Sequence, residues 1–160
     1  MKTIKYSTRH SAIEKILQFN KDAFIISSVG LTSRALYEVK DSPNHFYMMG
    51  SMGCALGFAI GLALNTNKEV VAILGDAEII MGYPTLMLTE YLKLPNLSIY
   101  ILDNNQHQST GGQKTISKNL PKCGHNVWTI NIKDNHIPKR IPLTHNFISK
   151  RFYNAINGLQ

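Results

Sequence analysis

Residues 69–77, EVVAILGDA, decide the fold class of this 160-residue chain. Residues 69–74 form a continuous, largely apolar run rich in β-branched side chains, which is typical of a strand buried on both faces of a parallel sheet. Residues 97–105, LSIYILDNN, repeat the pattern of a buried strand followed by polar residues. Ligands of open parallel sheets bind beyond the carboxyl ends of the strands, so the two stretches predict a polar site where these strands end.

Strands and helices alternate on both sides of this core. We expect strands over residues 23–28, 46–49, 69–74, 97–102 and 127–132, and helices over 9–19, 32–39, 51–64, 83–92 and 147–156, with Thr32 or Ser33 capping the second helix. Such alternation implies right-handed crossovers. The expected fold is therefore α/β, a three-layer, doubly wound, mainly parallel sheet. The length of the chain fits a single domain over residues 1–160 and is too short for two domains.

Composition excludes several classes of protein. A hydrophobic fraction of 44% with 17% charged residues excludes a largely disordered chain. Cys54 and Cys123 stand alone, which predicts neither a disulfide framework nor a zinc ribbon and fits a reducing compartment. The polar residues 1–10 do not resemble a secretory signal peptide. We therefore expect a cytoplasmic protein.

The formal charge of +7 lies mostly near the end of the chain. Residues 1–118 hold 11 Lys and Arg against 9 Asp and Glu, whereas residues 119–160 hold 6 against 1. No basic run is interleaved with aromatic residues, so nucleic-acid binding is disfavoured. A solvated or subunit-contacting tail accounts for the charge better.

Residues 46–64 carry no charge and have the length of a membrane span. The helical part, residues 51–64, is only about 21 Å long at 1.5 Å per residue, which is too short for a bilayer. Gly53, Gly57 and Gly61 recur every four residues and predict a helix face that another backbone approaches closely. A buried helix of a layered domain, with no membrane association, is the better interpretation.

Asp76 and Asn104 each follow one of the two central strands. If these strands are neighbours, their ends lie about 5 Å apart. A carboxylate and an amide oxygen suit Mg²⁺, which completes its coordination shell with phosphate oxygens and water. An aspartate after a strand is also a common helix cap, so both interpretations of Asp76 stay open at this point.

The stretch from Gly75-Asp76-Ala77 to Asp103-Asn104-Asn105 resembles the thiamin diphosphate motif, which begins GDG and ends in paired asparagines. Three further stretches strengthen the resemblance, namely residues 33–37 (SRALY), 47–53 (YMMGSMG) and 107–115 (HQSTGGQKT). Together they cover about residues 9–118 and resemble most closely the phosphonopyruvate and sulfopyruvate decarboxylases. The resemblance implies the thiamin diphosphate-binding fold, with thiamin diphosphate and Mg²⁺ as cofactors.

The resemblance also implies roles for individual residues. The Mg²⁺ ligands would be the side chains of Asp76 and Asn104 and the carbonyl of Gln106. The remaining cofactor-binding residues would be Gly30 at the diphosphate, Gly50 at the aminopyrimidine, Ser51, Met52, Gly75 and Ala77. Met52 would wedge the cofactor into a bent shape and would count as catalytic together with His107, whereas simple core filling is the alternative for Met52.

His107 has three interpretations: a surface loop residue, a ligand, or a contact to an anionic substrate. It lies beside Ser109, Thr110 and two glycines, a set that can form an anion-binding nest of backbone amides. We expect His107, Ser109 and Thr110 on the substrate side of the site.

Two departures from the family pattern put cofactor affinity in question. Ala77 replaces the third motif glycine, and Glu78 stands where the family has a small residue near the diphosphate. A carboxylate there repels the diphosphate unless it turns away. The part of the chain from about residue 119 is also shortened, with a helix and a strand missing between residues 121–124 and 137–138.

By resemblance, the chain is the diphosphate-binding subunit of a thiamin diphosphate-dependent carboxy-lyase acting on sulfopyruvate or phosphonopyruvate. The family also needs a glutamate from a pyrimidine-binding domain, and none of the five glutamates lies in such a domain. A partner subunit would supply it, which implies a hetero-oligomer active only when assembled. The alternatives are an acetolactate-synthase-like enzyme and a degenerate paralogue that binds a partner but little cofactor.

Overall fold

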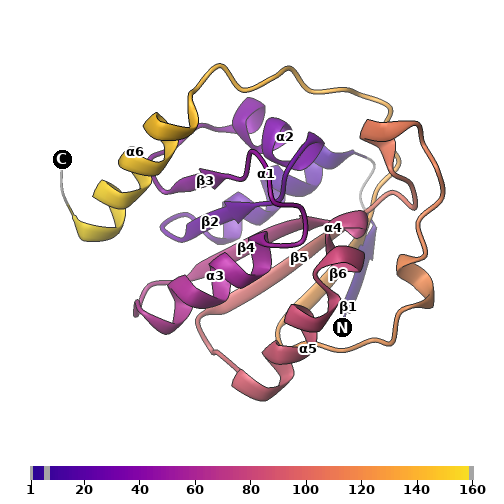
Figure 1. Cartoon of the computed structure of the whole chain (residues 1–160), viewed down its shortest axis with the longest axis horizontal. Helices are drawn as coiled ribbons and strands as arrows, with labels where there is room; N and C mark the ends of the chain where they lie inside the picture. Colours follow the sequence, from indigo (N-terminus) through magenta and orange to yellow (C-terminus); the bar gives the residue numbers. More distant parts are fainter. Residues whose placement is uncertain (1, 6–7, 159–160) are drawn as a thin grey trace.

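The computed structural model describes residues 2–5 and 8–158 and places a parallel sheet at the centre of the molecule (Figure 1). The sheet has six strands in the order β1-β6-β5-β4-β2-β3, and every neighbouring pair is parallel. The strands are β1 (Lys2–Lys5), β2 (Phe24–Ser27), β3 (His45–Tyr47), β4 (Val70–Gly75), β5 (Leu97–Asp103) and β6 (Val127–Asn131). The expected doubly wound sheet is confirmed.

Helices cover both faces of the sheet, which makes three layers (Figure 1). The helices are α1 (Arg9–Phe19), α2 (Leu31–Val39), α3 (Ala55–Leu64), α4 (Asp76–Met81), α5 (Tyr83–Leu92) and α6 (His145–Asn157), with short 3-10 turns at Gln108–Thr110 and Ser117–Asn119. Helices α1 and α2 pack on one face, and α3, α4 and α5 pack on the other. Helix α6 lies along the β3 edge, where Phe152 joins one core and Ile148 the other.

The central strands are buried because their side chains are apolar on both faces. Residues 70–74 of β4 are all buried, and β4 contacts β2 on one side and β5 on the other. No helix of the described residues has both the length and the apolar character needed to cross a membrane. The expected helix over residues 51–64 is buried on one side only: Ala55, Leu56, Ala59, Ile60 and Ala63 face the core, whereas Phe58 and Leu64 are exposed. It begins at Ala55 rather than at Ser51.

The glycines of α3 do not form the close helix contact that we expected. A Cβ atom at Gly57 would lie 3.9 Å from Thr85, and one at Gly61 would meet nothing within 4 Å. The close approach lies before the helix, where a Cβ at Gly82 would come 2.6 Å from the Gly53 carbonyl oxygen. The absence of a side chain at Gly82 therefore allows the junction of α4 and α5 to pack closely against the loop that precedes α3.

Two further expectations need correction. Helix α4 begins directly after β4, where the sequence predicted no helix, because six residues are too few to show a periodic pattern. Thr32 and Ser33 do not cap α2; they lie inside it, and Gly30 is the N-cap without a side-chain hydrogen bond. Gly30 has a φ of 78°, a backbone conformation that favours glycine.

Buried His45 predicts a pH-dependent stability. Burial lowers the pKa of His45 to about 4, and its Nδ1 atom lies 3.0 Å from the Lys40 carbonyl oxygen. An unfolded histidine titrates near 6.5, so the unfolded state binds more protons than the folded state between about pH 6.5 and 4. The free energy of unfolding therefore falls as the pH drops through this window.

We expect urea denaturation of the wild type to give about 2 kcal/mol less stability at pH 5 than at pH 7 from this group, since each pH unit contributes about 1.4 kcal/mol. His45→Gln, which cannot titrate, should lose this part of the difference. His145→Gln, at an exposed position of α6, is the control and should keep it. Equal pH dependence in wild type and His45→Gln would contradict the assignment.

Candidate functional site

A cavity of about 130 Å³ lies at the carboxyl ends of β2, β4 and β5. Strands β4 and β5 are direct neighbours, and Gly75 pairs with Leu102, so Asp76, the first residue after β4, lies level with Asp103, the last residue of β5. Most of the predicted site residues line this cavity, namely Gly30, Met52, Gly75, Asp76, Ala77, Asn104, Gln106, His107, Ser109 and Thr110. The structure thus brings them together from four separate segments.

Asp76 is the most buried acidic group of the cavity, with 3% of its surface exposed. Its Oδ2 atom accepts a hydrogen bond of 2.6 Å from the Thr115 hydroxyl, which lies 3.3 Å from the Ser117 hydroxyl. Ser117 in turn donates to Asp103 Oδ2 at 3.4 Å. Burial, together with the nearby Asp103 carboxylate, raises the pKa of Asp76. The hydroxyls of Thr115 and Ser117 thus link two buried carboxylates, Asp76 and Asp103. A cation bound beside them would reduce the repulsion between their charges.

Asn104 places an amide at the same strand ends. Its Oδ1 atom accepts from the Gln106 backbone amide at 3.3 Å, and its Nδ2 atom donates to Gln108 Oε1 at 3.0 Å. Gln106 also forms an antiparallel bridge with Lys114, which closes the loop after β5. The chemistry of this donor set fits Mg²⁺, because carboxylate, amide and backbone oxygens are the ligands that hard cations take.

The start of α2 forms another wall of the cavity through Gly30, Leu31 and Thr32. No side chain caps this nine-residue helix. Its first amides therefore have no side-chain acceptor, and a helix N-terminus of this kind favours an anion such as a phosphate group. The cavity combines a hard-cation donor set with an anion-binding helix end.

Arg9 is a cavity residue that the sequence did not point to. It begins α1, is only 4% exposed, and donates from Nη2 to Gln108 Oε1 at 2.7 Å. Its Nη1 atom lies 3.5 Å from Asp134 Oδ2 but makes no hydrogen bond within the described part of the chain. Burial lowers the pKa of Arg9, and the carboxylates of Asp134 and Asp76 act against this. A buried guanidinium in the cavity wall suits an anion bound there.

Glu78 also lines the cavity and is buried. Its Oε1 atom accepts from the Ala55 amide at 3.2 Å, at the first turn of α3, while Oε2 has no hydrogen-bond partner among the described residues. One oxygen is thus bound to a helix N-terminus, which stabilises a negative charge. The Glu78 carboxylate therefore points toward the start of α3, while the residue still lines the cavity.

Two of the predicted cofactor-binding residues lie outside this cavity. Gly50 and Ser51 do not line the cavity with Asp76; they line a neighbouring depression with Met49 and His145. The expected nest beside His107 is not open either. The amides of Thr110 and Gly112 both donate to the His107 carbonyl, so they do not point at a ligand. Met52 is 40% exposed in the cavity wall, which excludes the core-filling interpretation.

The sequence from residue 27 to residue 136 matches the family described as thiamine pyrophosphate enzyme, C-terminal TPP binding domain. The match covers more than half of the chain, so the chain belongs to this family of thiamin diphosphate-binding domains. The expected family membership is confirmed, and the match spans β4, β5 and the loop that together hold Asp76 and Asn104.

The relatives of known name are decarboxylases. The chain is 42% identical over 109 residues to the sulfopyruvate decarboxylase β subunit of Methanothermobacter thermautotrophicus, covering 68% of this chain and 59% of that protein. It is 40% identical over 111 residues to phosphonopyruvate decarboxylase of Streptomyces viridochromogenes, covering 69% of this chain and 28% of that protein. The chain therefore spans about a quarter to three fifths of these relatives.

A solved structure supports the fold. An X-ray structure from Mycobacterium smegmatis, described as a thiamin diphosphate-dependent enzyme, superposes with a TM-score of 0.60 at 16% identity. The similarity covers 79% of this chain and 32% of that one. The sheet and its flanking helices thus share the fold of the matched third of that protein, and the identity is too low to carry over residue roles.

Proposed function

We propose that this chain is the diphosphate- and Mg²⁺-binding subunit of a thiamin diphosphate-dependent decarboxylase that acts on sulfopyruvate or phosphonopyruvate. The observation that carries the proposal is the placement of buried Asp76 beside Asn104 at the ends of neighbouring strands, facing the uncapped start of α2. The family match and the two named decarboxylase relatives support it. The free Cys54 and Cys123 support a cytoplasmic location.

The chain's own residues would bind and orient the cofactor. Asp76, Asn104 and the carbonyl of Gln106 would hold Mg²⁺, and the amides at Gly30 and Leu31 would bind the diphosphate. Met52, half-exposed in the wall, would set the cofactor's bent shape. Gly50 and Ser51 would contact its aminopyrimidine end, which extends beyond this cavity. When bound, thiamin diphosphate supplies the electron sink for loss of CO₂ from a 2-oxo acid.

A partner subunit would complete the site. Of the five glutamates, only Glu78 lines the cavity, and it is bound to the Ala55 amide. The catalytic glutamate of the pyrimidine-binding domain would therefore come from the partner. The layer of α3, α4 and α5 leaves large apolar side chains exposed, including Phe58, Met81, Met87, Leu88 and Tyr91, which is typical of a protein interface.

The proposal is tested by measuring CO₂ release from sulfopyruvate and from phosphonopyruvate. We expect no turnover by the purified chain and turnover after co-purification with its pyrimidine-binding subunit. Turnover by the chain alone would contradict the partner requirement. An acetolactate-synthase-like enzyme would instead consume a second oxo acid in step with the first, and a degenerate paralogue would stay inactive with every partner.

Glu78 supports the degenerate paralogue, so its charge needs a direct test. Two unit charges about 5 Å apart at an effective dielectric constant of about 20 repel by about 3 kcal/mol, which corresponds to about a hundredfold in affinity. Glu78→Gln keeps an acceptor for the Ala55 amide but removes the charge. We expect it to bind thiamin diphosphate at least about tenfold more tightly, because the α3 terminus offsets part of the repulsion.

The measurement is calorimetric titration of the assembled subunits, with Glu14→Gln, at an exposed position of α1, as the matched control. Equal affinity of the wild type and Glu78→Gln would show that Glu78 does not oppose the cofactor. The degenerate paralogue would then lose its main support.

A further inference from the structure

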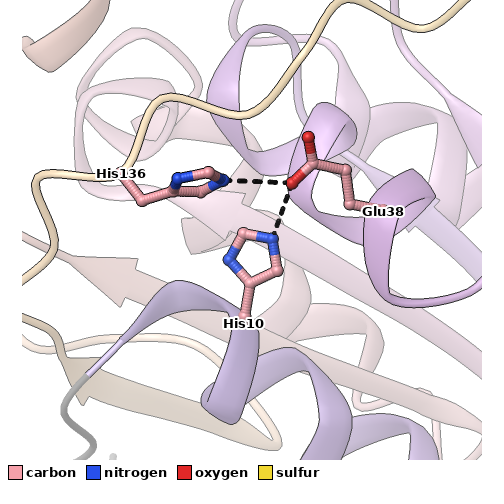
Figure 2. A group of neighbouring side chains, drawn as sticks. All are labelled: His10, Glu38 and His136. Carbon is pink, nitrogen blue, oxygen red and sulfur yellow. Dashed lines mark hydrogen bonds and ion pairs between the residues drawn. The ribbon is translucent and has the colours of Figure 1, made fainter.

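We propose that His10, Glu38 and His136 form a site for a divalent transition metal such as Zn²⁺, separate from the thiamin diphosphate cavity. Figure 2 shows the three side chains converging from α1, α2 and the connection between β6 and α6. None of them lines the cavity that holds Asp76. The proposal therefore stands independently of the proposed function.

The geometry suits a small ion. The Nε2 atoms of His10 and His136 lie 2.9 Å and 3.2 Å from the same Glu38 oxygen, Oε2 (Figure 2). One ligand atom from each residue lies within 4.8 Å of the other two. A tetrahedral zinc ion with bonds of about 2.0–2.2 Å needs ligand atoms about 3.4 Å apart. The three atoms thus reach coordination distance with small side-chain movements.

The kinds of ligand select the metal. Two imidazoles and one carboxylate suit Zn²⁺ and its neighbours in the transition series, whereas Mg²⁺ takes oxygen ligands. Two neutral imidazoles and one carboxylate leave a single negative charge to face a dication. His136 is about half exposed, so solvent reaches the cluster and can supply the remaining ligand.

The surroundings already orient the carboxylate. Glu38 Oε1 accepts from the Lys139 amide at 2.7 Å, which turns Oε2 toward the two histidines. The His136 amide donates to Asp134 Oδ1 at 2.9 Å, which fixes the backbone of the same connection. Partners of this kind hold metal ligands in place. The rings of His10 and His136 meet edge to face with centroids 5.0 Å apart, so the two imidazoles are not stacked on each other.

A metal here would fasten the connection between β6 and α6 to the first two helices. This connection runs without helix or strand from Ile132 to Thr144 and passes over α1 and α2 (Figure 1). Asp134, in the same segment, accepts from the Arg9 amide at 2.9 Å. The metal would thus fix this connection in place close to Asp134, which binds the Arg9 amide.

The test is Zn²⁺ titration of the untagged, chelator-treated chain, followed by calorimetry with excess Mg²⁺ present. We expect one Zn²⁺ per chain. His10→Ala and His136→Ala should each weaken binding more than about 100-fold, because loss of a mere second-shell partner already costs 10–100-fold. Glu38→Gln, which keeps the shape of the side chain, should weaken it as well. His145→Ala, exposed on α6, is the matched control and should bind as the wild type does.

A second measurement keeps the test decisive if a variant folds poorly. Hydrogen exchange of the wild type should slow over residues 133–139 when Zn²⁺ is added, and it should not change in His136→Ala. Equal Zn²⁺ affinity in wild type, His10→Ala and His136→Ala would overturn the proposal. So would the absence of Zn²⁺ binding by the folded wild type, in which case the two histidines only form hydrogen bonds to Glu38.

Discussion

Asp76→Ala is expected to abolish the Mg²⁺-dependent binding of thiamin diphosphate while the chain stays folded. The change removes a buried carboxylate that lines the cavity together with Asn104, and with it the charge that a bound dication needs. The fold should survive because the buried Asp76 carboxylate is costly in the absence of a cation, as its raised pKa shows. Calorimetric titration of the assembled subunits measures the effect.

The control for this variant is Asp22→Ala, which removes an exposed carboxylate from the loop before β2. It should leave the affinity for thiamin diphosphate unchanged. If Asp76→Ala also binds the cofactor with wild-type affinity, Asp76 serves only to begin α4, and the proposed Mg²⁺ site would be wrong.

Arg9→Met is expected to weaken thiamin diphosphate binding by about 10–100-fold. Hydrogen bonds to charged groups contribute about 1.5–3 kcal/mol, and about 1.4 kcal/mol corresponds to tenfold in affinity. Arg9 lines the cavity, and its charge interacts with that of Asp76, so we expect the guanidinium to lie near the diphosphate of the bound cofactor. Affinity for thiamin without its diphosphate should change little.

Arg9 also pairs with Asp134, so loss of the ion pair needs its own control. Asp134→Asn keeps the guanidinium and removes the partner charge. If Arg9 contacts the diphosphate, Asp134→Asn should bind the cofactor within about threefold of the wild type, well inside 1 kcal/mol. Equal losses in both variants would mean that Arg9 acts only through the structure of the 132–144 connection.

The parts of the fold that the sequence predicted are those with a clear hydrophobic pattern, either helical periodicity or a continuous apolar run. Helices α1 and α5 have the predicted bounds, and β4 and β5 were evident because both are long apolar runs. Helix α4 was missed because its six residues follow β4 with no capping side chain. The predicted start of α2 was too late in the chain. The helix begins after Gly30, whose positive φ takes the place of a capping side chain, so the sequence has no capping residue to mark the start.

The site was predictable where its residues follow strands. Asp76 and Asn104 each follow a buried strand, and neighbouring parallel strands bring such residues together. Arg9 was not predictable, because a charged residue on an amphipathic helix is ordinarily solvated, and its buried contacts are to Gln108 and Asp134, far along the chain. The contact of Glu78 with Ala55 likewise depends on how α4 packs against the start of α3.

Titration of the assembled subunits with thiamin diphosphate, with and without Mg²⁺, tests the central claim most directly. The account predicts saturable binding that requires both Mg²⁺ and the diphosphate group, so that chelation of Mg²⁺ or replacement of the ligand by thiamin removes it. Binding of thiamin as tight as that of thiamin diphosphate, binding that persists without Mg²⁺, or no binding at all would contradict it.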